Sequence, residues 1–366
     1  MKESEMYPQL KINTRKIYEN ARDLVNYCHE REITISGVIK GFNALPEVVN
    51  EFIRADCAHI ASSRIEQLIE IKKQGLDVCC MLIRLPMYCE LENLVKYVDI
   101  SLNSELCTLE LINDLCKKNN KSHGVILMLD LGDLREGFID ESEIINAAIY
   151  VEKSLEHIEL KGIGTNLGCY GSVRPTIENL SKLVAVANEI EKKTGRKLEI
   201  ISGGSTTTIS LLLEGKLPKG INNLRVGEAI LLNRDLPDLW KVPVLNLHQQ
   251  TFILKAQVVE IKDKPTYPIG ELFIDAFGNL PEYTDRGIRK RAILAVGKQD
   301  FAMHDKLIPL LEGIEIIGSS SDHLIIDIEN CKEKINIGDI LEFDMYYAPM
   351  LYLTASIGVK KVYVNE

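Results

Sequence analysis

A lysine at position 40 follows a short run rich in β-branched residues, and Gly41 comes directly after it. The run from Ile33 to Ile39 predicts a buried strand, and Gly41 would let the backbone turn away sharply. Such a lysine has two interpretations. It can extend its ammonium group into solvent where the strand ends. Alternatively, partial desolvation can lower the pKa of the amine, which then attacks a carbonyl group to form a Schiff base.

Two glycine turns late in the chain could bind a phosphate group. Residues 201–206 have the sequence ISGGST and precede a predicted helix, whose free N–H groups and neighbouring hydroxyl groups suit an anion. Taken alone, this segment equally fits an ordinary turn with a Ser or Thr N-cap. A second turn, LRVGE at 224–228, ends the next predicted strand. We expect both loops to grip one phosphate if the strands belong to a barrel.

The elements that would position these residues form a regular alternation. Eight strand-like segments alternate with helical periodicity up to residue 226, which predicts an α/β fold, a (β/α)8 barrel of the TIM type. The predicted strands are 33–39, 59–61, 78–83, 98–101, 125–129, 159–163, 198–201 and 223–226. Because the carboxyl ends of barrel strands share one mouth, we expect a ring of polar side chains there: Lys40, Ser62, Ser63, Arg84, Asn103, Arg135, Asn166, Ser202 to Thr206, and Arg225.

The pattern of apolar and polar residues changes after about residue 238. Short alternating runs, separated by Gly, Pro and Asp, replace the helical periodicity and predict an all-β domain. We therefore expect a barrel domain over 1–238, whose first strand could instead join the second domain, and a C-terminal β-domain over 239–366.

The composition limits the kinds of molecule that the protein is expected to bind. The chain has 366 residues, 26% of them charged, and a formal net charge of −10, which argues against nucleic-acid binding. No signal peptide or membrane span is expected. Nine cysteines without a C-x-x-C pair indicate reduced thiols, a cytoplasmic location and no metal site. The expected partners are a small molecule and a second copy of the chain.

A strand-end lysine, a late phosphate loop and an arginine on the last strand suggest pyridoxal 5'-phosphate as the cofactor. With these features the sequence resembles the fold-type III pyridoxal-phosphate enzymes, the alanine racemase family, over nearly its whole length. Within that family it is most similar to the ornithine racemase-type subgroup. The segment GIGTNLG at 162–168 looks superficially like a dinucleotide-binding fingerprint, but it has one residue too many before its last glycine.

The resemblance assigns roles to matching residues. It implies that Lys40 binds the cofactor covalently, that Ser205 and Tyr347 contact the phosphate, and that Arg225 faces the pyridine nitrogen. Arg135, in the D-x-G-x-x-R segment at 130–135, would contact the cofactor ring oxygen and the substrate carboxylate. The other residues expected to line the cofactor site are Asn166, Ser202, Gly204, Thr206, Gly227 and Glu228.

The β-domain would complete the site of a neighbouring subunit. The resemblance implies that segments 297–300 and 318–323 enter the partner's site in a homodimer, with Ser321 and Asp322 near the substrate. The family's second catalytic base, a tyrosine, has no clear counterpart, because Phe277 occupies its place. Tyr283 and His323 are the candidates for that role, although His323 beside Asp322 could equally form a structural pair.

Other departures concern the barrel. Alanine racemases have a lysine, often carbamylated, seven residues before the site arginine, where this chain has Met128. Arg135 must therefore be held in another way. Asn166 replaces the histidine that packs on the cofactor ring, and Ala44 replaces a tyrosine near the phosphate.

Together these residues predict a two-base racemase. Lys40 would remove the α-proton from one face of an amino acid, and an acid on the other face would return one. Arg225 stays charged and cannot readily protonate the pyridine nitrogen, which favours racemisation over transamination or decarboxylation. Ornithine is the expected substrate, with alanine, lysine or another amino acid as alternatives, and a diamino acid would need an unidentified acceptor for its distal ammonium. Two further alternatives are a metal-assisted lyase of the D-threonine aldolase or D-serine dehydratase type, and a non-catalytic pyridoxal-phosphate-binding protein.

Overall fold

The computed structural model describes residues 6–242, 245–280 and 282–366. The chain divides into two compact units. One comprises Ile17–His248, and the other comprises Met1–Lys16 together with Gln249–Glu366.

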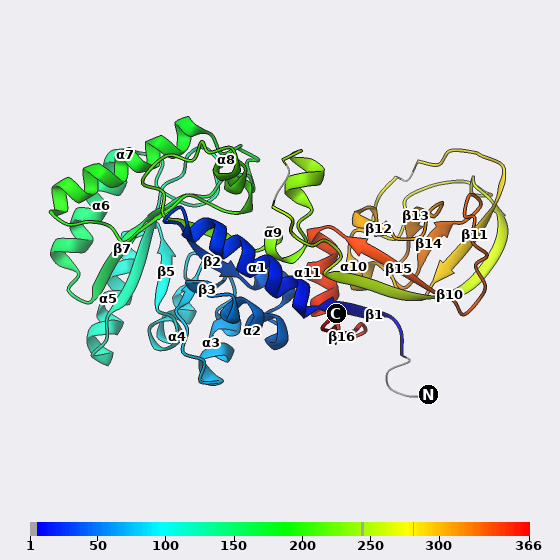
Figure 1. The fold of residues 1–366 in the computed structure, drawn as a ribbon, viewed down its shortest axis with the longest axis horizontal. Coiled ribbons are helices and arrows are strands. Elements are labelled where there is room, and N and C mark those ends of the chain that lie inside the picture. The colour runs from blue at the N-terminus through cyan, green and yellow to red at the C-terminus, as the bar shows by residue number, and fades with distance from the viewer. Residues whose placement is uncertain (1–5, 243–244, 281) are drawn as a thin grey trace. The chain divides into compact units, whose positions relative to one another are not determined.

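The first unit is a closed barrel of eight parallel strands with helices around it, which confirms the predicted (β/α)8 fold (Figure 1). Each strand pairs with the next, and the barrel closes where Ile35 of β2 lies opposite Leu224 of β9. The strands are β2 (Thr34–Val38), β3 (His59–Ser62), β4 (Cys80–Leu82), β5 (Ile100–Asn103), β6 (His123–Met128), β7 (Ile158–Gly164), β8 (Ile200–Ser202) and β9 (Asn223–Val226).

Side chains cap the N-termini of helices α6 and α7. Asp140 accepts hydrogen bonds from the N–H groups of Ser142 and Glu143 at the start of α6, and Thr176 caps α7 in the same way. Gly195 ends α7 with a left-handed backbone, a conformation that glycine adopts without strain. The helices are α1 (Thr14–His29), α2 (Pro46–Arg54), α3 (Ile65–Lys73), α4 (Leu91–Tyr97), α5 (Leu106–Asn119), α6 (Glu141–Ser154), α7 (Ile177–Thr194), α8 (Ile209–Leu213) and α9 (Glu228–Leu231).

Alternate residues of the strands fill one side of the barrel interior with an apolar cluster. It contains Val38, Ala61, Met81, Ile100, Leu102, Ile126, Met128 and Ile200. Strand β7 approaches β8 too closely for a side chain, since a Cβ on Gly162 would lie 1.7 Å from the carbonyl oxygen of Ile200.

The second unit is built on a mostly antiparallel sheet in the order β12-β15-β10-β11-β14-β13. Strand β1 (Gln9–Asn13) belongs to this sheet, between β10 and β16. The other strands are β10 (Phe252–Pro265), β11 (Ile288–Leu294), β12 (Leu307–Pro309), β13 (Glu315–Ser319), β14 (Leu324–Asp327), β15 (Ile340–Met345) and β16 (Lys360–Val364).

This sheet confirms the predicted C-terminal β-domain, and the described part of the region also contains two helices that the sequence pattern did not indicate, α10 (Lys298–Phe301) and α11 (Tyr347–Ala355). Helix α11 has the sequence YAPMLYLTA, without a charged residue. Helical periodicity depends on alternation between apolar and polar faces, so a helix of this composition gives no such signal.

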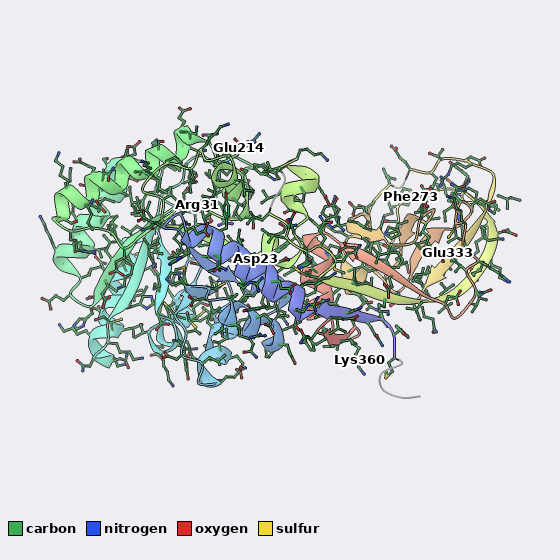
Figure 2. All side chains as sticks on the ribbon, in the orientation of Figure 1. Asp23, Arg31, Glu214, Phe273, Glu333 and Lys360 are labelled. Carbon is green, nitrogen blue, oxygen red and sulfur yellow. The ribbon has the colours of Figure 1, made fainter. Side chains whose placement is uncertain are left out.

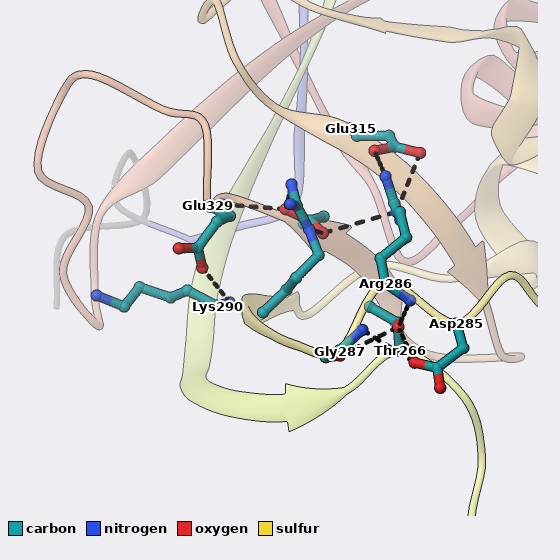
Figure 3. Close-up of polar contacts among 9 residues, drawn as sticks. Thr266, Asp285, Arg286, Gly287, Lys290, Glu315 and Glu329 are labelled. Carbon is teal, nitrogen blue, oxygen red and sulfur yellow. Dashed lines mark hydrogen bonds and ion pairs between the residues drawn. The ribbon is translucent and has the colours of Figure 1, made fainter.

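A buried carboxylate ties three strands of this sheet together. Asp327, whose side chain is 1% exposed, accepts hydrogen bonds from Nε and Nη2 of Arg289. Arg286 lies 3.7 Å from Asp327 and also pairs with Glu315 at 2.8 Å (Figure 3). Within the described ranges, no helix of either unit is long and apolar enough to cross a membrane.

Candidate active site

Lys40 lies two residues beyond β2, at the carboxyl end of the barrel, where it begins a short 3₁₀ turn (Lys40–Phe42). Its side chain is half-buried, and it forms no hydrogen bond or ion pair with any other described residue. Burial lowers the pKa of its amine, and the positive charges of Arg135 and Arg225 lower it further. This environment suits a nucleophilic amine better than a solvated surface lysine.

The sharp turn after Lys40 does not depend on Gly41, contrary to the prediction. Gly41 lies within the 3₁₀ turn, and the left-handed residues are Asn43 and Ala44, with φ of 52° and 51°. Asparagine tolerates this conformation better than most residues. The side chain of Gln67, on α3, donates a hydrogen bond of 3.3 Å to Asn43 Oδ1 and so supports the turn.

Arg225, on β9, is the buried cation of the barrel mouth, with 4% of its surface exposed. Its Nη2 donates 2.7 Å hydrogen bonds to the carbonyl oxygen of Thr165 and to Oδ1 of Asn166, and its Nη1 donates to Ser202 Oγ. Burial lowers the pKa of Arg225 to about 10, so the guanidinium stays charged near neutral pH. A Cβ on the neighbouring Gly164 would lie 3.2 Å from Ser202 Cβ and 3.4 Å from Arg225 Nη1, so the backbone of β7 packs closely against these two side chains.

Arg135 is held by the residue next to it, Glu136. Arg135 Nε and Nη2 both donate to the Glu136 carboxylate, the second at 2.6 Å, and Nη1 donates to Cys169 Sγ at 3.0 Å. Burial by itself would lower the pKa of Arg135, but the hydrogen bond and negative charge of Glu136 raise it overall. Glu136 also accepts a hydrogen bond from Asn166 Nδ2, which links Arg135 to Arg225 through two side chains.

Glu136 is the functional residue that sequence reasoning missed. The sequence showed that Arg135 needs a partner in place of the family's lysine, and Met128 in that position is fully buried and apolar. A carboxylate directly after the arginine was the available signal. This signal is weak, because the side chains of adjacent residues meet only where the loop backbone turns both of them to the same side.

The loop after β7 is held in place by hydrogen bonds to a buried carboxylate. Asp133, 1% exposed, accepts hydrogen bonds from the backbone N–H groups of Cys169 and Val173. Gly171 packs so closely that a Cβ there would lie 2.5 Å from the carbonyl oxygen of Asp133. These contacts hold the segment that carries Asn166 and Cys169 against the segment that carries Arg135.

The two glycine loops lie side by side, as the sequence predicted. The backbone N–H of Arg225 donates to the carbonyl oxygen of Gly204 at 2.9 Å, and the N–H of Ala229 donates to Thr206 Oγ1 at 3.4 Å. Ser205 and Gly227 immediately precede short helical segments, η4 (Thr206–Thr208) and α9. The first N–H groups of such turns have no intrahelical acceptor, so both loops can present donors to an anion.

Glu228, the first residue of α9, binds the protein's own backbone. Its Oε1 accepts hydrogen bonds from the N–H groups of Arg234 and Asp235 at 2.8 Å and 3.0 Å. Burial raises the pKa of Glu228 to about 7, and the charge of Asp235 adds to this effect. These bonds brace the turn that follows the second glycine loop.

The donor set at the barrel mouth fits pyridoxal phosphate. A half-buried primary amine can react with an aldehyde, the paired loops offer N–H and hydroxyl donors to a phosphate, and a buried guanidinium can face the ring nitrogen. Gly204 has φ of 111°, and a Cβ there would lie 2.9 Å from Thr208 Oγ1, so this loop position requires glycine. The residues present therefore offer the reactive and charged groups that this cofactor needs.

The remaining predicted site residues belong to the second unit. Segments 297–300 and 318–323 are docked together there, because the N–H of Lys298 donates to the carbonyl oxygen of Ser320 at 2.9 Å. Gln299 Nε2 donates to Asp322 Oδ1 at 2.7 Å, and Ser321, Asp322 and His323 are exposed. Tyr347 is the first residue of α11.

The second-base candidates lie on different segments of this unit. Tyr283 lies in the loop between β10 and β11, 43% exposed, with its ring against Tyr267 at 6.3 Å. The same loop carries Phe277, whose ring contacts the ammonium of Lys298 at 3.7 Å, and the exposed Phe273 (Figure 2). His323 follows the docked segment, with its N–H bound to Ser320 Oγ at 3.1 Å.

Comparison with known proteins places this geometry in a family. Residues 12–234 match the family model described as the alanine racemase N-terminal domain. An ornithine racemase of Acetoanaerobium sticklandii is 44% identical over 346 residues, covering 94% of this chain and 96% of the relative. A lysine racemase of Thermotoga maritima is 38% identical over 364 residues, covering 98% of this chain and 99% of the relative.

Solved structures agree with this result at the level of the fold. An alanine racemase from a D-cycloserine producing Streptomyces lavendulae superposes with a TM-score of 0.75 at 15% identity, covering 99% of this chain and 98% of that one. An alanine racemase from Bartonella henselae, with covalently bound pyridoxal phosphate, gives a TM-score of 0.74 at 18% identity, covering 98% and 100% of the two chains. The sequence matches and the shared fold lead to one conclusion: the chain belongs to the alanine racemase family.

Proposed function

We propose that this protein is a pyridoxal-phosphate-dependent racemase that interconverts the enantiomers of ornithine. The observation that carries the proposal is the half-buried amine of Lys40, which pairs with no other described residue and lies within the influence of the charges of Arg135 and Arg225. The substrate is proposed from the ornithine racemase and the lysine racemase, which both match almost the whole chain and are named for diamino acids.

Each part of the cofactor has a proposed partner in the barrel. Lys40 Nζ would hold it covalently, the loops at 202–206 and 227–228 would bind its phosphate, and Arg225 would face the pyridine nitrogen. Arg135, held by Glu136 and linked through Asn166, would lie towards the ring oxygen and the substrate carboxylate. Tyr347, on α11, is the proposed additional phosphate contact.

Pyridoxal phosphate, when bound, withdraws electrons from the α-carbon of an amino acid and acidifies its α-proton. Lys40 then accepts that proton at Nζ, and its lowered pKa makes the neutral, proton-accepting amine more abundant. Arg225 keeps its own proton, because even a pKa of about 10 leaves it fully charged near neutral pH. It therefore orients the site without acting as an acid.

Inversion requires a second group, which delivers a proton to the opposite face. Tyr283 and His323 are the proposed candidates, and both carry a titratable group on an exposed segment of the second unit. We also propose a homodimer, in which the docked segments 297–300 and 318–323 serve the partner's site, and a cytoplasmic location, consistent with nine free cysteines. Light scattering in solution tests the dimer, which a monomeric mass would contradict.

Chiral chromatography tests the proposed activity. The purified protein with added cofactor is incubated separately with L-ornithine, L-lysine and L-alanine, beside a Lys40→Ala variant. We expect L-ornithine to become a near-equal mixture of enantiomers, and the variant to be inactive. A protein that binds the cofactor but inverts none of the three amino acids would overturn the proposal, and retro-aldol assays with a divalent metal would then follow.

A further inference from the structure

A line of polar side chains runs through the barrel interior from Arg225 towards the opposite end. We call Ser202, Asn223, Ser36 and His59 the polar column. Side chains two residues apart on a strand point to the same face. Ser202 therefore shares the interior with Ile200, Ser36 with Val38, and His59 with Ala61, all members of the apolar interior cluster.

The column is continuous. Arg225 Nη1 donates to Ser202 Oγ, whose hydroxyl donates to Asn223 Oδ1 at 2.7 Å. Asn223 Nδ2 donates to Ser36 Oγ at 3.0 Å, and Ser36 Oγ lies 2.9 Å from His59 Nδ1. Ser36, Ser202 and Asn223 are fully buried, so water cannot replace these partners.

The bonds define the direction of the column as far as Ser36. Ser202 Oγ accepts from Arg225, and its single proton is therefore available for Asn223 Oδ1. Asn223 Nδ2 donates to Ser36 Oγ and also to Thr34 Oγ1 at 3.1 Å. The direction of the Ser36–His59 bond depends on which ring nitrogen of His59 carries the proton. With that proton on Nε2, Ser36 donates to Nδ1, and all donors point from Arg225 towards His59, an order that strengthens each bond in a low-dielectric interior.

The far end of the column lies at the amino ends of the strands. His59 lines a cavity of about 1060 Å³ there, together with Lys72, Asp99 and Lys161. Burial lowers the pKa of His59, although the charge of Asp99 opposes this shift. A neutral His59 with its proton on Nε2 matches the direction of the column.

We infer that Asn223 and Ser36 are positioning residues, which fix the guanidinium of Arg225 through Ser202 from inside the barrel, with His59 as the terminal acceptor. This inference rests on the proposed role of Arg225 at the cofactor ring nitrogen. A guanidinium displaced by a fraction of an ångström would be poorly oriented towards that nitrogen. Substitutions in the polar column should therefore change kcat and the absorbance spectrum of the bound cofactor more than they change KM.

The barrel provides a matched control. Ser101 Oγ lies 2.8 Å from His123 Nε2, a second buried Ser–His pair, which also bonds to Asn103 and to the backbone of Val98. No described hydrogen bond connects this pair to Arg225. Ser101→Ala should remove as much hydrogen bonding from the barrel as Ser36→Ala does, without disturbing the column.

The first experiment compares Asn223→Leu, Ser36→Ala and Ser101→Ala as purified, cofactor-loaded enzymes. We expect kcat to fall about 10- to 100-fold for Asn223→Leu and several-fold for Ser36→Ala, with KM nearly unchanged and the absorbance maximum of the bound cofactor shifted. Ser101→Ala should keep the wild-type kcat and spectrum. If Asn223→Leu fails to fold, Ser36→Ala decides the question alone. Wild-type kcat and spectrum in Ser36→Ala, or equal losses in Ser36→Ala and Ser101→Ala, would overturn the inference.

A second readout needs neither cofactor nor activity. In protein labelled with ¹⁵N-histidine, the ring nitrogens report which one carries the proton, and the His59 signals are those lost in His59→Gln. We expect His59 to be neutral with its proton on Nε2, and this pattern to change in Ser36→Ala but not in Ser101→Ala. A proton on Nδ1 in the wild type would contradict the direction of the column. Because this result is independent of catalysis, it separates failure of the column from failure of the proposed racemase activity.

Discussion

Glu136 binds the guanidinium of Arg135, its immediate neighbour in the chain, through two hydrogen bonds. The same carboxylate accepts from Asn166, which in turn accepts from Arg225. Two arginines of the candidate site are thus connected through one acid and one amide. Because like charges repel in a partly buried site, the negative charge of Glu136 is what allows both guanidinium groups to approach Lys40.

Replacing Glu136 by Gln should weaken substrate binding. The amide keeps the size of the side chain but removes the charge that holds Arg135, so we expect KM for the amino acid to rise about tenfold, with a smaller loss in kcat. Steady-state kinetics with each enantiomer measure both quantities. Glu141→Gln is the control, because Glu141 pairs with Lys182 on the exposed surface of α6. An unchanged KM in Glu136→Gln would show that Glu136 does not hold Arg135 for the substrate.

Adding one methyl group at Gly204 should impair cofactor binding. The residue has φ of 111°, and a Cβ would lie 2.9 Å from Thr208 Oγ1, so Gly204→Ala must move the phosphate loop. We expect the dissociation constant of pyridoxal phosphate to increase about tenfold or more, measured by absorbance titration. Gly215→Ala serves as the control, since Gly215 also has positive φ, of 66°, but faces open space. Equal affinities in the two variants would contradict the assignment of this loop.

Exchange of the substrate's α-proton with D₂O should identify the second base. Tyr283→Phe and His323→Gln are compared in D₂O, with Tyr267→Phe, the ring neighbour of Tyr283, as the control. Loss of the true base should reduce inversion about 10²- to 10⁴-fold. Lys40 should nevertheless still exchange the α-proton of one enantiomer. If both variants invert ornithine at the wild-type rate, neither residue is the second base.

Asp327 should make the stability of the second unit depend on pH. Burial would raise the pKa of this carboxyl, but the hydrogen bonds from Arg289 outweigh it and hold the pKa below the ordinary 3.8. The folded state therefore binds fewer protons than the unfolded state. The stabilisation is complete above about pH 5 and is lost as the pH falls through the lowered folded-state pKa.

The corresponding variant is Asp327→Asn, with Asp263→Asn on exposed β10 as its control. At pH 7 we expect Asp327→Asn to lower the free energy of unfolding by about 2 kcal/mol, because the buried acceptor loses its charge. Denaturant unfolding followed between pH 7 and pH 3 should show a smaller acid-induced loss in this variant than in the wild type. If the free energy of unfolding falls equally between pH 7 and pH 3 in the wild type and in Asp327→Asn, Asp327 is not the source of the pH dependence.

The barrel and the residues with reactive groups could be predicted from the sequence. Strand and helix periodicities alternate with short loops, and parallel strands joined in this way close into a barrel with one functional mouth. That rule was enough to bring Lys40, the 201–206 loop and Arg225 to the same end. Helix α11 could not be predicted from periodicity, because its sequence contains no charged residue. The turn after Lys40 uses Asn43 and Ala44 and not the predicted Gly41.

The contacts that hold these groups could not be predicted in the same way, because they form between segments far apart in the chain or in irregular loops. Glu136 reaches Arg135 because the loop backbone turns both side chains to one side, and Asn223 reaches Ser36 across 187 residues of sequence. Periodicity specifies which face of a strand a side chain occupies, but a hydrogen bond requires two atoms within about 3 Å at a suitable angle. That condition depends on strand register, loop conformation and rotamers together, and packing of the whole barrel sets all three.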